Sequence, residues 1–304
     1  MSADLAFMSA VDLARNIRQK KVSSLEATEN FFERIDRLDS QLNSYLALCH
    51  DQALANARAA DETVQQGSDL GPLHGVPISI KDLEFTKDAT TTMGSALFRD
   101  RVPDIDSIVV ERVKASGAII LGKTNTPEFG LSGTTENKLG EPCRNPWDTQ
   151  RTPGGSSGGA AAALAAGLCA LSTGSDGGGA IRIPASFSGL FGIKPTQGRV
   201  PRYGGYGRPS ANHFSQSGPI TRTVADSALL LQVLSGPDSR DVTSIRTSAP
   251  DFSAGLDAGV KGLKFAWSSD YGYAAVDPEV VLVTESAAQV FAGMGATVDD
   301  GNLK

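Results

Sequence analysis

The chain has 304 residues, of which 40% are hydrophobic and 20% charged, with a formal net charge of −6 and an isoelectric point near 5.2. This composition is typical of folded globular proteins and unlike that of disordered chains. The negative charge argues against a nucleic-acid partner, because phosphate binding needs a concentrated basic surface. A small neutral substrate is the better expectation.

The metal-ligating side chains are few and scattered. The three cysteines, Cys49, Cys143 and Cys169, show no short ligand spacing, and only three histidines accompany them. We therefore expect no disulfide framework and no metal site. The chain opens without a basic leader, and its longest apolar stretch, 160–171, is broken by Gly167. A cytoplasmic location without a membrane partner follows as an expectation.

Helices are predicted for the first part of the chain. Apolar residues recur at helical spacing over 9–21 and 24–38, and Ser23 with Glu26 matches a capping box at the start of the second segment. An Ala-rich helix is predicted over 51–66. Residues 1–70 are therefore expected to form a helical N-terminal portion.

From Gly71 onward, strand and helix patterns alternate along the chain, which is typical of an α/β fold. We predict strands over 76–81, 118–122, 169–173, 263–267 and 296–298, and helices over 105–116, 160–167, 224–234 and 278–294. No internal repeat is visible.

A glycine-rich segment carries the most specific pattern. Gly154-Gly155-Ser156-Ser157-Gly158-Gly159 precedes the Ala-rich helix, and Gly174-Ser175-Asp176-Gly177-Gly178-Gly179-Ala180-Ile181-Arg182 follows it. This arrangement resembles the signature of the amidase signature family. Further motifs at 75–82, 122–125, 192–196 and 218–226 occur in the order that the family shows. A phosphate-binding loop is rejected, because no Gly-Lys-Ser/Thr follows the glycines.

The resemblance implies a three-layer α/β fold, in which a mostly mixed central sheet is covered by helices on both faces. It implies a single domain over 1–304, with a signature core over 71–235. The family's domain continues beyond position 304, so the C-terminal part of the domain is expected to be lacking here. The implied activity is hydrolysis of a carbon–nitrogen amide bond through a serine acyl-enzyme, without a cofactor.

By the same resemblance, Lys81, Ser156 and position 180 match the catalytic triad, with a cis peptide bond at Ser156. A buried lysine loses affinity for its proton and can accept one, relayed by Ser156, from the attacking serine at position 180. Backbone N–H groups are expected to form an oxyanion hole for the tetrahedral intermediate. Its predicted residues are Gly177, Gly178, Gly179 and Ala180.

Ala180 departs from the pattern, because alanine stands where the nucleophilic serine is expected. A methyl group cannot attack a carbonyl, so the chain is expected to be close to inert. Either a deliberate Ser-to-Ala substitution or a natural pseudoenzyme would explain this. We favour the substitution because Lys81, Ser156 and the glycine loop all remain. Two milder departures are Ser175 in place of threonine and Gly177 in place of a bulkier residue.

Three neighbours are predicted to support the site. Asp176 is expected to cap the glycine turn and Arg182 to brace it. Ser157 either contacts Lys81 or caps the Ala-rich helix, and the sequence leaves both roles open. His213 is read as a loop or pocket residue, since its surroundings match no catalytic motif.

Other functions stay open at this point. The chain could be the amidase component of a tRNA-dependent amidotransferase, which needs a partner chain, or a catalytically dead amide-binding protein, or a structural module. The substrate class, whether aryl, aliphatic or hydrazide, is not specified by the sequence. A homodimer is the expected assembly.

Overall fold

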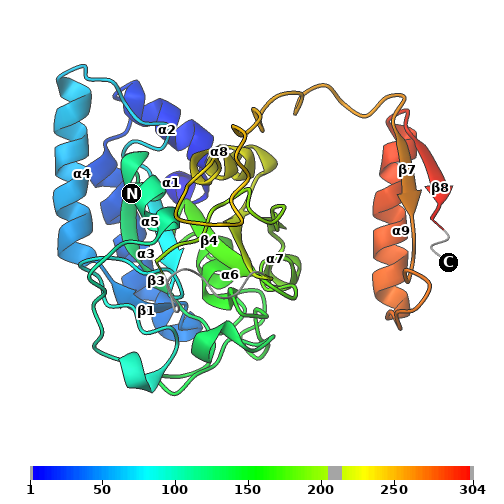
Figure 1. Cartoon of the computed structure of the whole chain (residues 1–304), viewed down its shortest axis with the longest axis horizontal. Helices are drawn as coiled ribbons and strands as arrows, with labels where there is room; N and C mark the ends of the chain where they lie inside the picture. The colour runs from blue at the N-terminus through cyan, green and yellow to red at the C-terminus, as the bar shows by residue number, and fades with distance from the viewer. Residues whose placement is uncertain (1–2, 205–213, 302–304) are drawn as a thin grey trace. The chain divides into compact units, whose positions relative to one another are not determined.

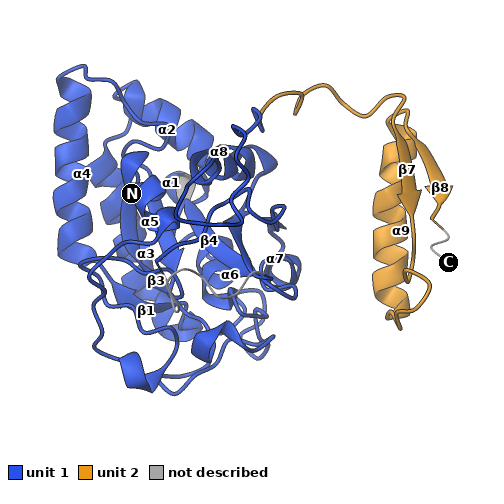
Figure 2. Ribbon diagram, viewed as in Figure 1, with its two compact units in different colours: residues 1–252 blue, residues 253–304 orange. Residues whose placement is uncertain are grey.

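The computed structural model describes residues 3–204 and 214–301. The chain forms two compact units, residues 1–252 and 253–304, which Figure 2 distinguishes by colour. In unit 1 the order of elements is α1 (Ala3–Phe7), α2 (Ala10–Arg18), α3 (Ser24–Leu42), β1 (Tyr45–Leu48), α4 (His50–Gln65), β2 (Pro77–Lys81), η1 (Ala96–Phe98), α5 (Ile108–Ala115), β3 (Ile119–Thr124), η2 (Glu128–Gly130), α6 (Gly158–Ala165), β4 (Leu171–Asp176), α7 (Arg182–Ser188), β5 (Phe191–Gly192), β6 (Gln216–Thr221) and α8 (Val224–Leu234).

The N-terminal helices form much as the sequence predicts. The hydroxyl of Ser23 caps α3 by accepting a hydrogen bond from the N–H of Glu26 at 2.9 Å. Phe31 and Ile35 lie on the buried stripe of this helix. Helix α3 runs four residues further than predicted and ends at Asn43, which adopts the left-handed conformation with φ 53°.

The central sheet is mixed, with the strand order β1-β3-β2-β4-β6-β5. Figure 1 labels β1, β3 and β4 of this sheet. Strand β2 lies between β3 and β4 and is parallel to both, whereas β1 and β6 run antiparallel to their neighbours. The chain passes from β2 through α5 to β3, and then returns through α6 across β2 to β4. Right-handed crossovers in opposite directions place α5 and α6 on opposite faces. The predicted mixed sheet with helices on both faces is confirmed.

This strand order determines where the chemistry can lie. The reversal of direction around β2 creates a crevice at the carboxyl ends of β2 and β4, where ligands of open α/β sheets bind. Lys81 is the last residue of β2 and Asp176 the last residue of β4. The strand predicted over 169–173 ends three residues later than expected, at Asp176. Asp176 and the glycine loop therefore lie directly at this edge.

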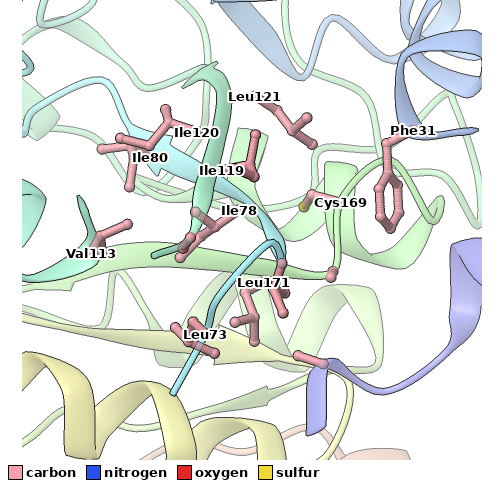
Figure 3. Packing of buried hydrophobic residues seen from close by; sticks show 14 of the residues in the cluster. Phe31, Leu73, Ile78, Ile80, Val113, Ile119, Ile120, Leu121, Cys169 and Leu171 are labelled. Carbon is pink, nitrogen blue, oxygen red and sulfur yellow. The ribbon is translucent and has the colours of Figure 1, made fainter. Parts of the chain in front are cut away.

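The hydrophobic core lies around the parallel strands. Every residue of β2, β3 and β4 is buried, as expected for parallel strands that are covered on both faces. Figure 3 shows Ile78, Leu121 and Leu171 from these strands within one cluster that also includes Phe31 of α3. The edge that carries Lys81 is therefore held by rigid, well-packed elements.

Unit 2 contains β7 (Lys264–Trp267), α9 (Pro278–Gly293) and β8 (Thr297–Asp300), close to the predicted elements. The two strands pair in parallel, with Lys264 opposite Thr297. Phe265 of β7 stacks on Phe291 of α9 with ring centroids 4.8 Å apart. Across the described residues of both units, no helix has the length and apolar character to cross a membrane.

A glycine in α6 gives a testable prediction about this packing. A Cβ at position 159 would lie 2.3 Å from the backbone nitrogen of Asn125 and 2.6 Å from the carbonyl oxygen of Ser44. Gly159→Ala is therefore expected to lower the free energy of unfolding by about 1–3 kcal/mol or more. Gly140→Ala is the control, because no atom lies within 4 Å of its added Cβ. Equal denaturation midpoints for the two variants would contradict the close approach of α6 to β3.

Candidate active site

Lys81 occupies the centre of the candidate site. Its side chain is fully buried, and its Nζ donates hydrogen bonds to the hydroxyls of Ser156 at 2.8 Å, Ser157 at 2.8 Å and Ser175 at 3.0 Å. The structure therefore brings together Lys81 and Ser156, which the resemblance paired, although they are 75 residues apart in the chain.

Burial changes the acid–base character of this lysine. Desolvation is the largest cause that lowers the pKa of Lys81, from 10.5 to about 7, and the charge of Arg202 acts in the same direction. The carboxylates of Glu84 and Asp176 oppose this shift. A substantial fraction of Lys81 is therefore neutral near pH 7 and able to accept a proton.

Ser156 and Ser157 precede α6 in the chain. The peptide bond between Gly155 and Ser156 is cis, as the resemblance implies. The hydroxyl of Ser157 makes no capping bond to α6, and it accepts from Lys81 instead. The backbone N–H of Ser157 donates to the carbonyl of Ala180 at 3.2 Å, so this serine also joins the two halves of the glycine-rich segment.

Asp176 organises the turn that follows β4. Its carboxylate accepts hydrogen bonds from the backbone N–H groups of Gly179 at 2.6 Å and Ile181 at 3.3 Å, and from Nε of Arg182 at 2.8 Å. Burial alone would raise the pKa of Asp176, but the bonds from Arg182 and the turn hold that pKa below its usual value. These contacts hold the turn after β4 together, and the supporting roles of Asp176 and Arg182 in catalysis stay predictions.

The predicted oxyanion hole is corrected at one residue. The N–H of Gly179 is directed to Asp176, and Gly179 is buried away from the cavity. Gly177, Gly178 and Ala180 line the cavity, and no acceptor within the described ranges takes their N–H groups. Of the four predicted donors, these three are available to bind a developing oxyanion.

The cavity beside Lys81 has a volume of about 660 Å³ and is lined by both Ser156 and Ala180. Position 180 is half-buried, and it presents a methyl group where the resemblance implies a nucleophile. Phe129 and Phe214 contribute apolar surface to the same cavity. Its size is in the range of small-molecule sites.

Sequence reasoning missed several polar side chains of the site. Ser175 was noted only as a departure from threonine, yet its hydroxyl bonds to Lys81. Glu84 and Arg202 line the cavity. Glu84 could have been noticed, since it is an acidic residue three positions after the candidate base in a largely apolar segment. Arg202 carried no local signal.

Beneath the site, a buried ion pair joins the ends of β2 and β3. The Nζ of Lys123 lies 3.5 Å from Oδ1 of Asp82 and donates to the carbonyl of Glu84 at 2.6 Å. Desolvation lowers the pKa of Lys123 and raises that of Asp82, while each charge partly offsets the shift of the other. This pair holds the backbone on either side of Glu84 in a defined position.

The remaining candidates take no part in this cluster. Burial raises the pKa of the Cys143 thiol far above its ordinary value, which leaves the thiol protonated and unreactive. His213 lies outside the described residues. Among residues 3–204 and 214–301, no three His, Cys, Asp or Glu side chains gather as a metal ion would require.

Comparison with known proteins places this geometry in context. Among curated relatives, the subunit designated A of glutamyl-tRNA(Gln) amidotransferase from Geobacter sp. (strain M21) is 43% identical over 96% of this chain and 60% of the relative. The corresponding protein from Moorella thermoacetica is 43% identical over 99% of this chain and 61% of the relative. The chain thus spans about 60% of the length of these relatives.

Solved structures agree with this relationship. A bacterial aryl acylamidase of the amidase signature family superposes with a TM-score of 0.91 at 36% identity, over 97% of this chain and 61% of that structure. The same amidotransferase component from Thermotoga maritima gives a TM-score of 0.83 at 32% identity, over 99% of this chain and 62% of that structure. The family model described as Amidase matches residues 26–304, and the chain therefore belongs to the amidase family.

Proposed function

We propose that this chain carries the amide-binding and amide-cleaving site of an enzyme of the glutamyl-tRNA(Gln) amidotransferase type, and that Ala180 leaves the site without its nucleophile. The observation that carries the proposal is Lys81, with its lowered pKa and its bond to Ser156, beside a cavity lined by Ala180. The sequence favoured a free amidase, but the curated relatives support the amidotransferase alternative better.

In the proposed reaction, a serine at position 180 attacks the amide carbonyl carbon and forms an acyl–oxygen bond. Its proton passes through the hydroxyl of Ser156 to Nζ of Lys81. The N–H groups of Gly177, Gly178 and residue 180 bind the carbonyl oxygen as it becomes negative.

The carbon–nitrogen bond then breaks, and the leaving nitrogen takes the proton back along the same path. Water, deprotonated by Lys81, hydrolyses the acyl ester and restores the serine. With alanine at position 180 the sequence of steps stops at the bound amide, because a methyl carbon has no lone pair to attack with. The proposed behaviour of this chain is therefore to bind an amide and leave it intact.

An amidotransferase passes the released nitrogen to a second substrate, so the proposal includes a different protein chain as partner. A homodimer and a cytoplasmic location remain expectations that accompany the proposal. The second candidate function is that of a free amidase. It is favoured by the similarity to the aryl acylamidase and by the aromatic surface that Phe129 and Phe214 add to the cavity.

Calorimetric titration of the unaltered protein with L-glutamine and with acetanilide tests the proposal. We expect saturable binding of an amide without release of ammonia or aniline. Tighter binding of glutamine would favour the amidotransferase type, and tighter binding of acetanilide the free amidase. Binding of neither, or turnover of either by this chain, would contradict the proposal.

A further inference from the structure

Glu84 is a carboxylate in the cavity wall that the proposed reaction does not use. It follows Lys81 by three residues, and its backbone N–H donates to the carbonyl of Lys81 at 3.0 Å. Its side chain is only 6% exposed. The turn after β2 therefore fixes this acid close to the candidate base, on the wall of the same cavity.

The carboxylate of Glu84 is only half satisfied. Its Oε1 accepts a hydrogen bond from the hydroxyl of Ser217 at 2.6 Å. Within the described ranges no donor reaches Oε2, and no cation forms an ion pair with the carboxylate. Two cations of the site have other hydrogen-bond acceptors: Lys81 donates to the serine hydroxyls, and Nη1 of Arg202 donates to the carbonyl of Ser215 at 2.7 Å.

The cavity wall therefore carries a carboxylate oxygen, Oε2 of Glu84, that accepts no hydrogen bond from the described residues. A ligand that brings an ammonium or another N–H donor to Oε2 gains a charge-assisted hydrogen bond there. The cavity of about 660 Å³ has room for a small amide with such a group.

We propose that Glu84 is a specificity-determining residue that selects amides carrying an alkylammonium group, which Oε2 binds while the amide lies beside Ser156 and position 180. The inference rests on the proposed function of the cavity as an amide site. It adds the charge of the substrate, which neither the family membership nor the predicted triad specifies.

Three para-substituted benzamides of similar size test the proposal on the unaltered protein: 4-(aminomethyl)benzamide, 4-methylbenzamide and 4-carbamoylbenzoate. We expect calorimetry near pH 7 to show the ammonium compound binding about tenfold more tightly than the methyl compound, since a charge-assisted hydrogen bond has roughly that effect. The carboxylate compound is expected to bind most weakly. This comparison needs no variant.

Glu84→Gln then assigns the preference to one residue. It removes the charge but keeps a side-chain oxygen that accepts from Ser217. We expect it to abolish the tenfold preference and leave the affinity for 4-methylbenzamide within about twofold. Glu128→Gln is the matched control, because Glu128 also accepts from a serine hydroxyl, that of Ser95 at 2.7 Å, but is exposed and outside the cavity lining.

The outcomes separate the two proposals. Equal binding of the three benzamides, or a preference that survives Glu84→Gln, would overturn the role of Glu84 and leave the amide site standing. A preference lost equally in Glu128→Gln would show a general charge effect and would also overturn it. Binding of L-glutamine or acetanilide but of none of the three benzamides would overturn the role of Glu84 alone, whereas binding of none of these five amides would overturn the proposed function itself.

Discussion

Ala180→Ser is expected to raise the rate of amide hydrolysis by a factor on the order of 10⁶, the scale on which serine hydrolases depend on their nucleophile. The surroundings that such a serine needs are in place. Lys81 has a pKa of about 7, and Ser156 lies 2.8 Å from its Nζ. A panel of aryl and aliphatic amides that includes L-glutamine, assayed for released amine or ammonia, measures the gain.

Two further variants control this gain. Ala180→Gly changes the same position without adding a hydroxyl and is expected to stay inert. Ser156→Ala, combined with Ala180→Ser, removes the proposed relay and is expected to lose at least about a hundredfold of the gained rate. A silent Ala180→Ser protein that still binds amides would favour the dead amide-binding protein over the disabled enzyme.

The pH dependence of the Ala180→Ser protein is the second large effect. A general base works only when it is deprotonated, so kcat/KM is expected to rise with pH and to reach half its plateau near pH 7. An unperturbed lysine would place that midpoint near 10.5. Burial moves it downward because the neutral amine tolerates the loss of water better than the ammonium does.

Removing the amine of Lys81 is expected to abolish both the gained activity and the rise of kcat/KM around pH 7. In the Ala180→Ser background, Lys81→Met is expected to lower the rate by a factor of roughly 10²–10⁴ and to flatten the profile around pH 7. Lys114→Met is the matched control, because Lys114 is a surface lysine paired with Asp106 at 2.8 Å. An alkaline limb that persists unchanged in Lys81→Met would assign the base to another group.

Elements with a strong local pattern could be predicted from the sequence. Examples are the apolar stripe of α3, the cap at Ser23 and the apolar run of β2, each of which is recognisable from a few consecutive residues. Strand β6 could not be found in this way, because Gly218 and Pro219 interrupt it, and both disfavour a strand. It forms because residues 216–220 pair with β4, with Pro219 opposite Thr173.

The same distinction holds for the site. The order of motifs along the chain was enough to propose Lys81, Ser156 and the missing nucleophile at position 180. Each of these positions lies in a short motif that can be recognised from neighbouring residues in the sequence. The bond between Lys81 and Ser175 joins residues 94 positions apart. It exists only because β2 and β4 are neighbours in the sheet.

A second property of the site depends wholly on this long-range packing. Ser217, which is 133 residues from Glu84 in the chain, occupies one oxygen of its carboxylate and leaves the other open. Spacing along the chain identifies which residue types are present. Whether a hydrogen-bonding group such as Oε2 of Glu84 has a partner depends on all of its neighbours, including residues from distant segments of the chain. Only the order of the strands brings those residues together.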